Sequence, residues 1–587
     1  MSMLTEIFRV RGMLALAGAL AGLSLWLLAE VLPDVTENDR LVLALSAFCV
    51  GTFTIFLAIT GPLPSRKAAP AAAVIGLVLA VLAYTASLRF DAVQPFIETL
   101  HPIFALALCI ALPIPFLVAG LSPGGGWLDY PKLFDAAWNT VVRTIASLLF
   151  LGAVWGVIAL SVALLGLVGV EIIEDLLDIE PVPYLLSGLV LGLGIGVADE
   201  LAEYVSPKLI LRLLRLLVPV VLVVTLIFLV TLPFRGVSGL FGTLSVAATL
   251  IAMAFAVATL VSTAIDRDDA SAVQGRWMRM ATRMLSLMLP VLAAFAVYSV
   301  SERVGQYGWS PDRLAAMSAS VLMAAYGLTY AGAVLARREW MGRIRQANGL
   351  VALGVLFLAT AWLTPLLNPQ RLAAQSQIAR YATGQVTADE LDLWSIGREW
   401  GRPGEAAIEV MAQMETPEQA RLIERLAALE QAGGRYAFET SVPPAQMQAT
   451  IAAVRAAISV LPDGAEVPEA VFAAQSNQTL ENWQAACDRR TPEDRSGCIA
   501  LRADLLPEAE GDETLMFFMF SERFVQAVAF GSDGGDVGRF GPTWVNDDPA
   551  LTSSPGMIDR IASGQFSIGP TRRNALSLGE SELILLP

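Results

Sequence analysis

LLRLLVPVVLVVTLIFLVTL occupies residues 213–232, and Arg215 is its only charged residue. The hydrocarbon core of a bilayer is about 30 Å thick and a helix rises about 1.5 Å per residue, so this run is long enough to cross a membrane as one helix. The whole chain has 587 residues, of which 55% are hydrophobic and 16% are charged, whereas soluble domains contain about 25% charged residues. The stretch and the composition together predict a polytopic α-helical membrane protein.

Runs of this kind recur along the first 367 residues, and the sequence predicts about eleven spans. They lie near 12–32, 41–60, 69–87, 103–121, 144–168, 184–198, 213–232, 240–264, 284–300, 314–335 and 349–367. The first run follows Arg9 and Arg11 as in a signal peptide, but it lacks a small-x-small cleavage site before Pro33, so we expect it to remain as an anchor. The sixth run is short and rich in glycine, which leaves open whether it crosses fully.

The basic residues between the runs predict an orientation, because Arg and Lys are enriched in cytoplasmic loops. With the N-terminus inside, 17 of the 22 Arg and Lys residues before residue 368 fall in inner segments and 5 in outer loops. The strongest inner cluster, RREWMGRIRQ at 337–346, is expected to contact anionic lipid head groups. An odd number of spans places everything after Pro365 outside. The Lys-poor, Ala- and Arg-rich composition favours a bacterium, so we expect the inner (cytoplasmic) membrane, a cytoplasmic N-terminus and a periplasmic C-terminal domain.

The charge of the chain is concentrated in its last part. From Asn368 onward there are 17 Arg, no Lys and 31 Asp or Glu, a formal charge of −14 out of −15 for the whole chain. Such acidity argues against nucleic acid as a partner. The expected partners are the lipid bilayer and, through the acidic external domain, another protein.

The predicted secondary structure of the external part changes along its length. Helical patterns with Gly or Pro-Asp-Gly stops occupy 416–434 and 443–464, whereas CIALRADL, TLMFFMF, RFVQAVAF and ELILLP after Cys498 are typical of strands. We therefore expect a soluble α+β domain with an antiparallel sheet packed on helices, and TLMFFMF buried on both faces. The expected domains are 1–367, the transmembrane helical bundle; 368–490, the helical part of the periplasmic domain; and 491–587, its β-rich part.

Two stretches beside the last spans carry a family resemblance. RVGQYGWSPDRL (303–314) and NPQRLAAQSQIARYATGQVTADELDLWSIGREWGRPGEAAIEVM (368–411) resemble bacterial polytopic membrane proteins classed as domain of unknown function 4153. The tail CIALRADLLPEAEGDETLMFF (498–518) is similar to alphaproteobacterial members of that family. The resemblance implies an inner-membrane protein with an external domain and brings no known activity. The functional candidates in these stretches are Tyr307, Trp309, Arg313, Arg371, Arg398 and Arg402.

The stretch YGWSPDRL (307–314) also has a purely structural interpretation. Ser310 is placed to cap a helix, with Pro311 at its first position and Asp312 in its first turn. Aromatic residues such as Tyr307 and Trp309 commonly anchor a chain at the membrane interface. A ligand site at the same place is the alternative.

Two structural interpretations fit the stretch VLGLGIGVADELAEYVSPK (190–208). Gly188 and Gly192 have the small-xxx-small spacing that lets helices approach closely. Tight packing followed by a hydrated loop is the interpretation that we favour. The alternative is a broken helix lining a cation path, with Asp199 and Glu200 as functional residues.

Residues for catalysis or metal binding are sparse. His101 is the only histidine, and no His/Cys cluster has zinc spacing. The acidic turn 507–513 lacks the alternating carboxylate spacing of a calcium loop. We therefore predict no catalytic residues, no metal and no cofactor, and we favour a protein that is not an enzyme.

Three functions remain as hypotheses. The leading one is an integral inner-membrane protein of unknown activity that anchors an acidic periplasmic binding, sensing or interaction domain. The alternative is a transporter or channel for a small solute, for which Gly-rich and Pro-kinked spans argue. The third is a membrane glycosyl- or lipid-transferase with a carboxylate base among Asp34, Glu37 and Asp39.

The four cysteines divide by location. Cys49 and Cys109 lie within apolar runs and are expected to be unpaired, whereas Cys487 and Cys498 flank the charged stretch CDRRTPEDRSGC. The predicted topology places this stretch in an oxidising compartment, where disulfides persist. We therefore predict a Cys487–Cys498 disulfide that joins the last helix of the helical part to the first strand of the sheet.

Overall fold

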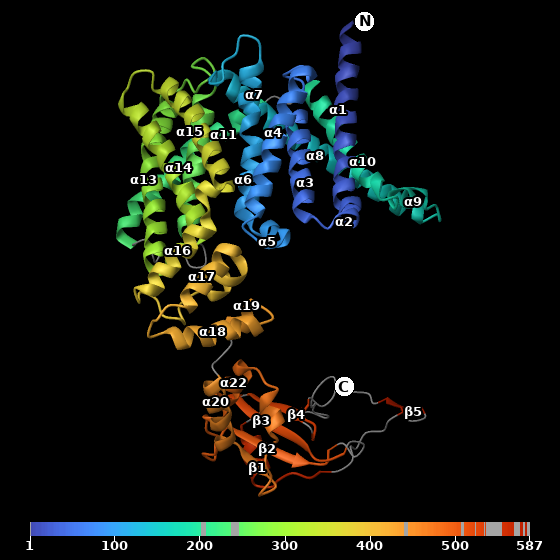
Figure 1. Ribbon diagram of the computed structural model, residues 1–587, viewed down its shortest axis with the longest axis vertical. Helices are drawn as coiled ribbons and strands as arrows, with labels where there is room; N and C mark the ends of the chain where they lie inside the picture. The colour runs from blue at the N-terminus through green and yellow to red at the C-terminus, as the bar shows by residue number, and fades with distance from the viewer. Residues whose placement is uncertain are drawn as a thin grey trace. The chain divides into compact units, whose positions relative to one another are not determined.

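The computed structural model describes residues 2–200, 207–235, 246–439, 444–505, 510–522, 524–532, 534–535, 555–568, 576–578 and 581–583 (Figure 1). The chain divides into two compact units, Met1–Gln419 and Ala420–Pro587. The first is a helical bundle, and the second holds the sheet. Each unit is described separately below.

Eleven helices among the described residues are long and apolar enough to cross a membrane, which confirms the predicted spans and indicates a membrane protein. The bundle contains α1 (Ser2–Trp26), a π-helical turn (Leu27–Val31), α2 (Leu32–Val35), α3 (Asp39–Ile59), α4 (Ser65–Ser87), α5 (Val93–Glu98), α6 (Leu100–Ala111), α7 (Pro113–Leu121), α8 (Tyr130–Gly166), α9 (Ile172–Leu177), α10 (Pro181–Glu200), α11 (Pro207–Arg235), α12 (Val246–Ile265), α13 (Arg276–Tyr307), α14 (Pro311–Leu335) and α15 (Trp340–Leu363).

Several spans differ in their bounds from the sequence expectation, among them the fourth, the eighth and the eleventh. The fourth is two helices, α6 and α7, separated at Leu112, because Pro113 and Pro115 cannot donate the hydrogen bonds that would continue α6. The eighth was expected from residue 240, but 236–245 lie outside the described residues. The eleventh ends at Leu363, and the 3-10 turn Pro365–Leu367 follows it.

Hydrogen bonds near the helix ends distinguish the two ends of the bundle. At one end Arg267 pairs with Asp135 at 2.9 Å and Lys67 donates to Leu121 O at 2.8 Å. At the other end Arg40 donates to Phe90 O at 2.8 Å. These contacts join only segments that the predicted topology places on one side. We call the first end, which holds the loops 122–129, 266–275 and 336–339 and the basic residues Lys67, Arg215, Arg267 and Arg345, the basic end.

Two arginines hold the last turn of α12 at the basic end. Arg345 donates to Ile265 O at 2.7 Å and to Asp266 O at 3.1 Å, and Arg215 donates to Thr263 O at 2.9 Å. The guanidinium groups satisfy carbonyls that have no partner within the helix and oppose its negative end. The expectation that the whole run 337–346 contacts lipid heads is therefore wrong for Arg345, which is buried.

α1 and α10 pack backbone to backbone. A Cβ atom on Gly188 would overlap the carbonyl oxygen of Gly18, and a Cβ on Gly192 would overlap that of Leu14. α10 is one uninterrupted helix. The close packing at Gly188 and Gly192 is confirmed, and a break within the span is wrong. The hydrated loop after α10 and a cation path through Asp199 and Glu200 stay predictions, because 201–206 lie outside the described residues.

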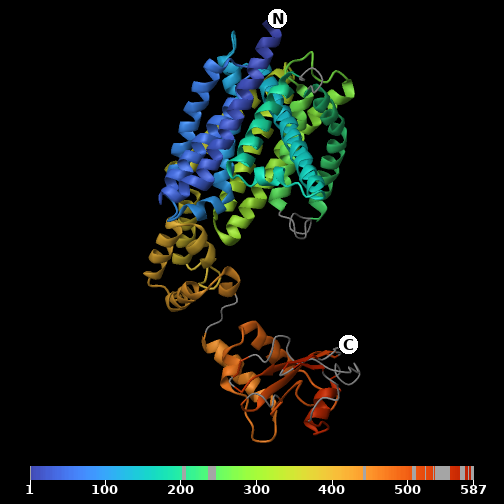
Figure 2. The same ribbon diagram turned by 90° about the vertical axis from the view of Figure 1, so that its right-hand side faces the viewer.

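Helices after residue 367 continue the first unit. They are α16 (Pro369–Ala382), the π-helical turn Ser395–Glu399 and α17 (Arg402–Ala412). In both views α16 and α17 lie at the end of the bundle away from the N-terminus (Figures 1 and 2). The compact units thus divide at 419, while the expected domain boundaries at 367 and 490 stay predictions.

The second unit combines helices with a four-stranded mixed sheet in the order β1-β2-β3-β4. From residue 419 the elements are α18 (Gln419–Gln431), α19 (Arg435–Glu439), α20 (Pro444–Ala457), β1 (Ser459–Leu461), α21 (Glu469–Ala473), α22 (Asn477–Cys487), β2 (Cys498–Ala503), β3 (Glu513–Ser521), β4 (Phe524–Phe530), α24 (Gly556–Ala562), β5 (Leu576–Leu578) and β6 (Ser581–Leu583).

Two expectations for this sheet need correction. The predicted helix 443–464 ends at Ala457, and Ser459–Leu461 after it form β1, parallel to β2. The predicted strand near ELILLP contributes β6, which pairs with β5 and not with the main sheet. The remaining pairs, β2–β3 and β3–β4, are antiparallel as expected.

The central strand β3 is buried on both faces, as its uniformly apolar sequence predicts. On one face Phe518 stacks on Trp483 of α22, with ring centroids 4.7 Å apart. On the other face Phe517 and Met519 pack with Ile558 of α24. The strand therefore joins two separate apolar clusters into one core.

Cys487 and Cys498 form the predicted disulfide, with their Cα atoms 4.7 Å apart. It joins the end of α22 to β2, which is the second strand and not the first. Within the loop that it closes, Thr491 donates to the buried carboxylate of Asp559 at 2.6 Å. The loop is thus fastened to α24 as well as to α22.

Candidate functional site

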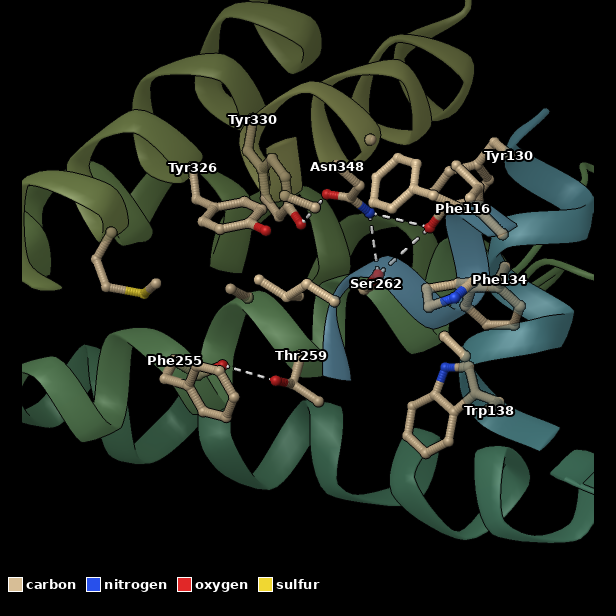
Figure 3. A pocket seen from close by; sticks show the side chains of 18 residues that line it. Phe116, Tyr130, Phe134, Trp138, Phe255, Thr259, Ser262, Tyr326, Tyr330 and Asn348 are labelled. Carbon is tan, nitrogen blue, oxygen red and sulfur yellow. Dashed lines mark hydrogen bonds between the residues drawn. The ribbon is translucent and has the colours of Figure 1, made fainter. Parts of the chain in front are cut away.

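A cavity of about 270 Å³ lies inside the bundle near its basic end (Figure 3). Its walls come from the α6–α7 break and from α8, α12, α14 and α15. The lining residues are Leu112, Pro115, Phe116, Tyr130, Leu133, Phe134, Ala137, Trp138, Phe255, Ala258, Thr259, Ser262, Met323, Tyr326, Tyr330, Asn348, Gly349 and Ala352.

One side of this cavity carries a hydrogen-bonded cluster. The amide of Asn348 donates to Tyr130 Oη and to Ser262 Oγ, both at 3.0 Å. Its carbonyl oxygen accepts from the hydroxyl of Tyr330. The four side chains come from four helices, so the cluster fixes α8, α12, α14 and α15 to one another.

Local sequence explains why space remains beside the cluster. Pro113 and Pro115 end the regular hydrogen bonding of the fourth span at the cavity wall. On α14, Gly327 allows close approach to α13, because a Cβ there would lie 2.7 Å from Pro290 Cα. That approach places Tyr326 and Tyr330, which Figure 3 shows on one side of the cavity with Tyr130 and Phe134 on the other.

Sequence reasoning missed this cluster. Tyr130, Ser262, Tyr330 and Asn348 are single polar residues in or beside four apolar runs. Nothing in the spacing along the chain links them, because only the tertiary packing of the helices brings them together. An asparagine at the start of the last apolar run was the one available signal.

The two family-like stretches meet at a second place, which we call the α16 junction. Gln377 of α16 donates to Tyr307 O at 3.0 Å and to Trp309 O at 3.1 Å, and Arg380 donates to Gln306 O at 2.8 Å. Arg313 donates to Gly308 O at 2.9 Å. The structure thus brings three predicted residues, Tyr307, Trp309 and Arg313, into one hydrogen-bonded turn.

The predicted helix cap in YGWSPDRL is confirmed, while interface anchoring by Tyr307 and Trp309 stays a prediction. Ser310 accepts a hydrogen bond from the backbone N–H of Arg313 at 3.2 Å, and Pro311 begins α14. The ring of Tyr307 lies under the Arg313 guanidinium, 5.3 Å from ring centroid to Cζ. A ligand at this turn stays a proposal.

A buried arginine ties α16 to the bundle. Arg89 donates to Trp362 O at 2.7 Å and to Thr364 O at 2.8 Å, with Gln370 Oε1 at 3.5 Å. Gln370 also contacts His101 Nε2 at 3.1 Å. Burial lowers the pKa of Arg89 to about 10, which leaves its guanidinium charged at neutral pH.

Arg402 completes the junction from α17. Its side chain pairs with Asp91 at 2.9 Å, and its backbone N–H donates to Arg89 O at 2.9 Å. The hydrogen bond from Arg402 holds the pKa of Asp91 below its usual value. Gly401 has φ +60°, and a Cβ there would lie 2.6 Å from Arg89 O. Glycine is therefore required where this strained turn touches the 89–91 loop.

The other predicted site residues are Arg371, Arg398, Asp199 and Glu200. Arg371 is exposed, and its backbone N–H is capped by Asn368 at 3.1 Å. Arg398 lies in the π-helical turn Ser395–Glu399. Asp199 and Glu200 end α10, and their side chains lie outside the described residues. Residues 507–509 of the acidic turn 507–513 also lie outside the described residues.

Replacing Arg89 with methionine is expected to destabilise the bundle by about 2–4 kcal/mol, because three buried acceptors lose a charged donor. Thermal unfolding of the detergent-purified chain measures the effect. Arg303→Met is the matched control, since Arg303 is exposed and lies over Tyr307. Equal unfolding temperatures for the two variants would contradict a stabilising role for the hydrogen bonds that Arg89 donates.

Comparison with known proteins identifies a family without an assigned activity. No curated protein and no solved structure matches the chain. One family model matches residues 12–398, a range that contains ten of the eleven spans, all but the first two residues of the remaining one, α16 and the stretch 303–314. Because this range covers more than half of the sequence, the chain belongs to the family described as Domain of unknown function (DUF4153).

Proposed function

We propose that this protein is an inner-membrane anchor for an acidic periplasmic domain that binds a protein partner. The carrying observation is that residues 420–587 form a compact unit of their own, with its own apolar core and its own disulfide. A self-contained unit joined to a membrane bundle is suited to recognition beside the membrane.

Charge supports both the orientation and the type of partner. The 17-to-5 distribution of basic residues favours a cytoplasmic basic end. Residues 420–587 contain 13 Arg, no Lys and 23 Asp or Glu, a formal charge of −10. An acidic domain repels acidic surfaces and attracts basic ones, so we infer a partner with a basic contact surface.

Deleting residues 420–587 tests this proposal. In a strain that lacks the protein, the full chain should restore the lost phenotype, whereas a chain ending at Gln419 should insert in the membrane without restoring it. Western blots of membrane fractions control for the amount of each chain. Full restoration by the shortened chain would contradict the proposal.

A transporter for a small solute is the second candidate, and the cavity beside the α6–α7 break favours it. Reconstituted vesicles would then show solute flux that a cavity-filling Ala352→Phe substitution reduces. The transferase alternative gains no such support, because Asp34, Glu37 and Asp39 are exposed where the first span ends and the second begins, and they do not line the cavity.

A further inference from the structure

The walls of the cavity are uncharged. None of its lining residues, all within the described part of the chain, is Asp, Glu, Lys, Arg or His. A charged group in such surroundings would have no partner, and an unpaired charge in a low-dielectric site is strongly unfavourable. The chemistry of the walls therefore selects a neutral occupant.

The hydrogens of the polar cluster are used within it. Both amide hydrogens of Asn348 and the hydroxyl hydrogen of Tyr330 are donated inside the cluster. Tyr130 and Ser262 lie 3.4 Å apart, so one donates to the other. The cluster therefore gives the cavity one polar side.

Tyr326 supplies a free donor beside this polar side. Its ring lies edge-on to Tyr330 with centroids 5.8 Å apart, and among the described residues its hydroxyl has no hydrogen-bond partner. Figure 3 shows that hydroxyl directed toward the middle of the lining residues. A free O–H group therefore faces the cavity, and it suits an occupant with an acceptor oxygen.

The surroundings of the cavity indicate where the occupant comes from. Phe255 lines it from α12, and 63% of its side chain is exposed in a helix that is apolar enough to cross the membrane. The volume is near the lower end of the roughly 300–1,000 Å³ typical of ligand pockets. A head group fits inside, while an attached chain extends past Phe255 into the bilayer.

We propose that this cavity binds the head group of a neutral lipid through a carbonyl or hydroxyl oxygen. The oxygen accepts from the hydroxyl of Tyr326, beside the Asn348 cluster. The aromatic walls formed by Phe116, Phe134 and Trp138 pack against the head group. Ring carbonyls of a quinone and the hydroxyl of a prenyl alcohol share this chemistry. The site is independent of the periplasmic domain and of its partner.

Equilibrium binding to the full chain in nanodiscs tests the proposal with three probes. Decylubiquinone presents ring carbonyls, farnesol presents a hydroxyl, and farnesyl diphosphate presents the same chain with a charged head. Saturable binding of at least one neutral probe, at one site per chain and tighter than the diphosphate, is expected. The stronger neutral probe identifies the head group. Absence of saturable binding by both neutral probes, or equal binding of the diphosphate, would overturn the proposal.

Variants place the binding in this cavity. Tyr326→Phe removes only a hydroxyl and should weaken binding about three- to tenfold, the range for one hydrogen bond between neutral groups. Tyr84→Phe is the matched control, because Tyr84 is exposed on α4, remote from the lining residues. Ala352→Phe, which fills part of the space, should weaken binding further. Unchanged affinity in Tyr326→Phe would assign the lipid to another place and overturn the inference, even if Ala352→Phe fails to fold.

Discussion

Replacing Gly188 with leucine is expected to separate α1 from α10 and to destabilise the bundle by at least about 3 kcal/mol. Even a Cβ at this position overlaps the backbone carbonyl of Gly18, which cannot rotate away as a side chain could. The neighbouring contacts of Gly192 with Leu14 and of Gly22 with Tyr184 are equally close. The two helices therefore cannot make room at Gly188 by a small local shift. Thermal unfolding and limited proteolysis of the purified chain measure the loss.

Gly156→Leu is the matched control for this experiment. Gly156 lies in α8, another apolar span, and nothing lies within 4 Å of a Cβ built on it. The control should unfold at the temperature of the parent chain. If Gly188→Leu and Gly156→Leu were equally stable, the backbone contact of α1 with α10 would not hold the bundle together.

Replacing Cys498 with serine is expected to destabilise the second unit by about 3 kcal/mol. The disulfide closes a loop of about a dozen residues, and the value follows from the chain entropy that this loop regains on unfolding. Both cysteines are buried, so serine also places a hydroxyl in an apolar cluster. Protease resistance of residues 420–587 in the full chain, with and without reductant, provides the measurement.

The control is Cys49→Ser, because Cys49 is a free cysteine in α3. It should leave the protease resistance of the second unit unchanged. Reductant should lower the resistance of the parent chain to that of Cys498→Ser and have no effect on the variant. A parent chain that reductant does not affect would contradict a stabilising disulfide.

The spans and the central strand could be predicted because local composition determines them. A run such as 213–232 has one stable environment, a membrane, and TLMFFMF has none but the middle of a core. The Cys487–Cys498 pairing was also predictable, because it needed only the topology and the elimination of the two cysteines within spans.

The cavity and the hydrogen bonds from buried arginines to distant backbone carbonyls could not be predicted, because they depend on the register of one helix against another. Asn348 reaches Tyr130 across 218 positions of sequence, and Arg89 reaches Trp362 across 273. β1 was missed for a related reason. Its three residues follow a helix without a break in the apolar pattern, and pairing with β2 decides their conformation.

The central claim is that the second unit lies on the opposite side of the membrane from the basic end. Cysteines introduced by Asp463→Cys, in the second unit, and by Arg338→Cys, at the basic end, test it, because both parent side chains are exposed. A membrane-impermeant maleimide is added to spheroplasts that express each variant. Labelling of the Asp463→Cys chain in intact spheroplasts, and of the Arg338→Cys chain only after permeabilisation, is the predicted result. Labelling of the Asp463→Cys chain only after permeabilisation would contradict the account.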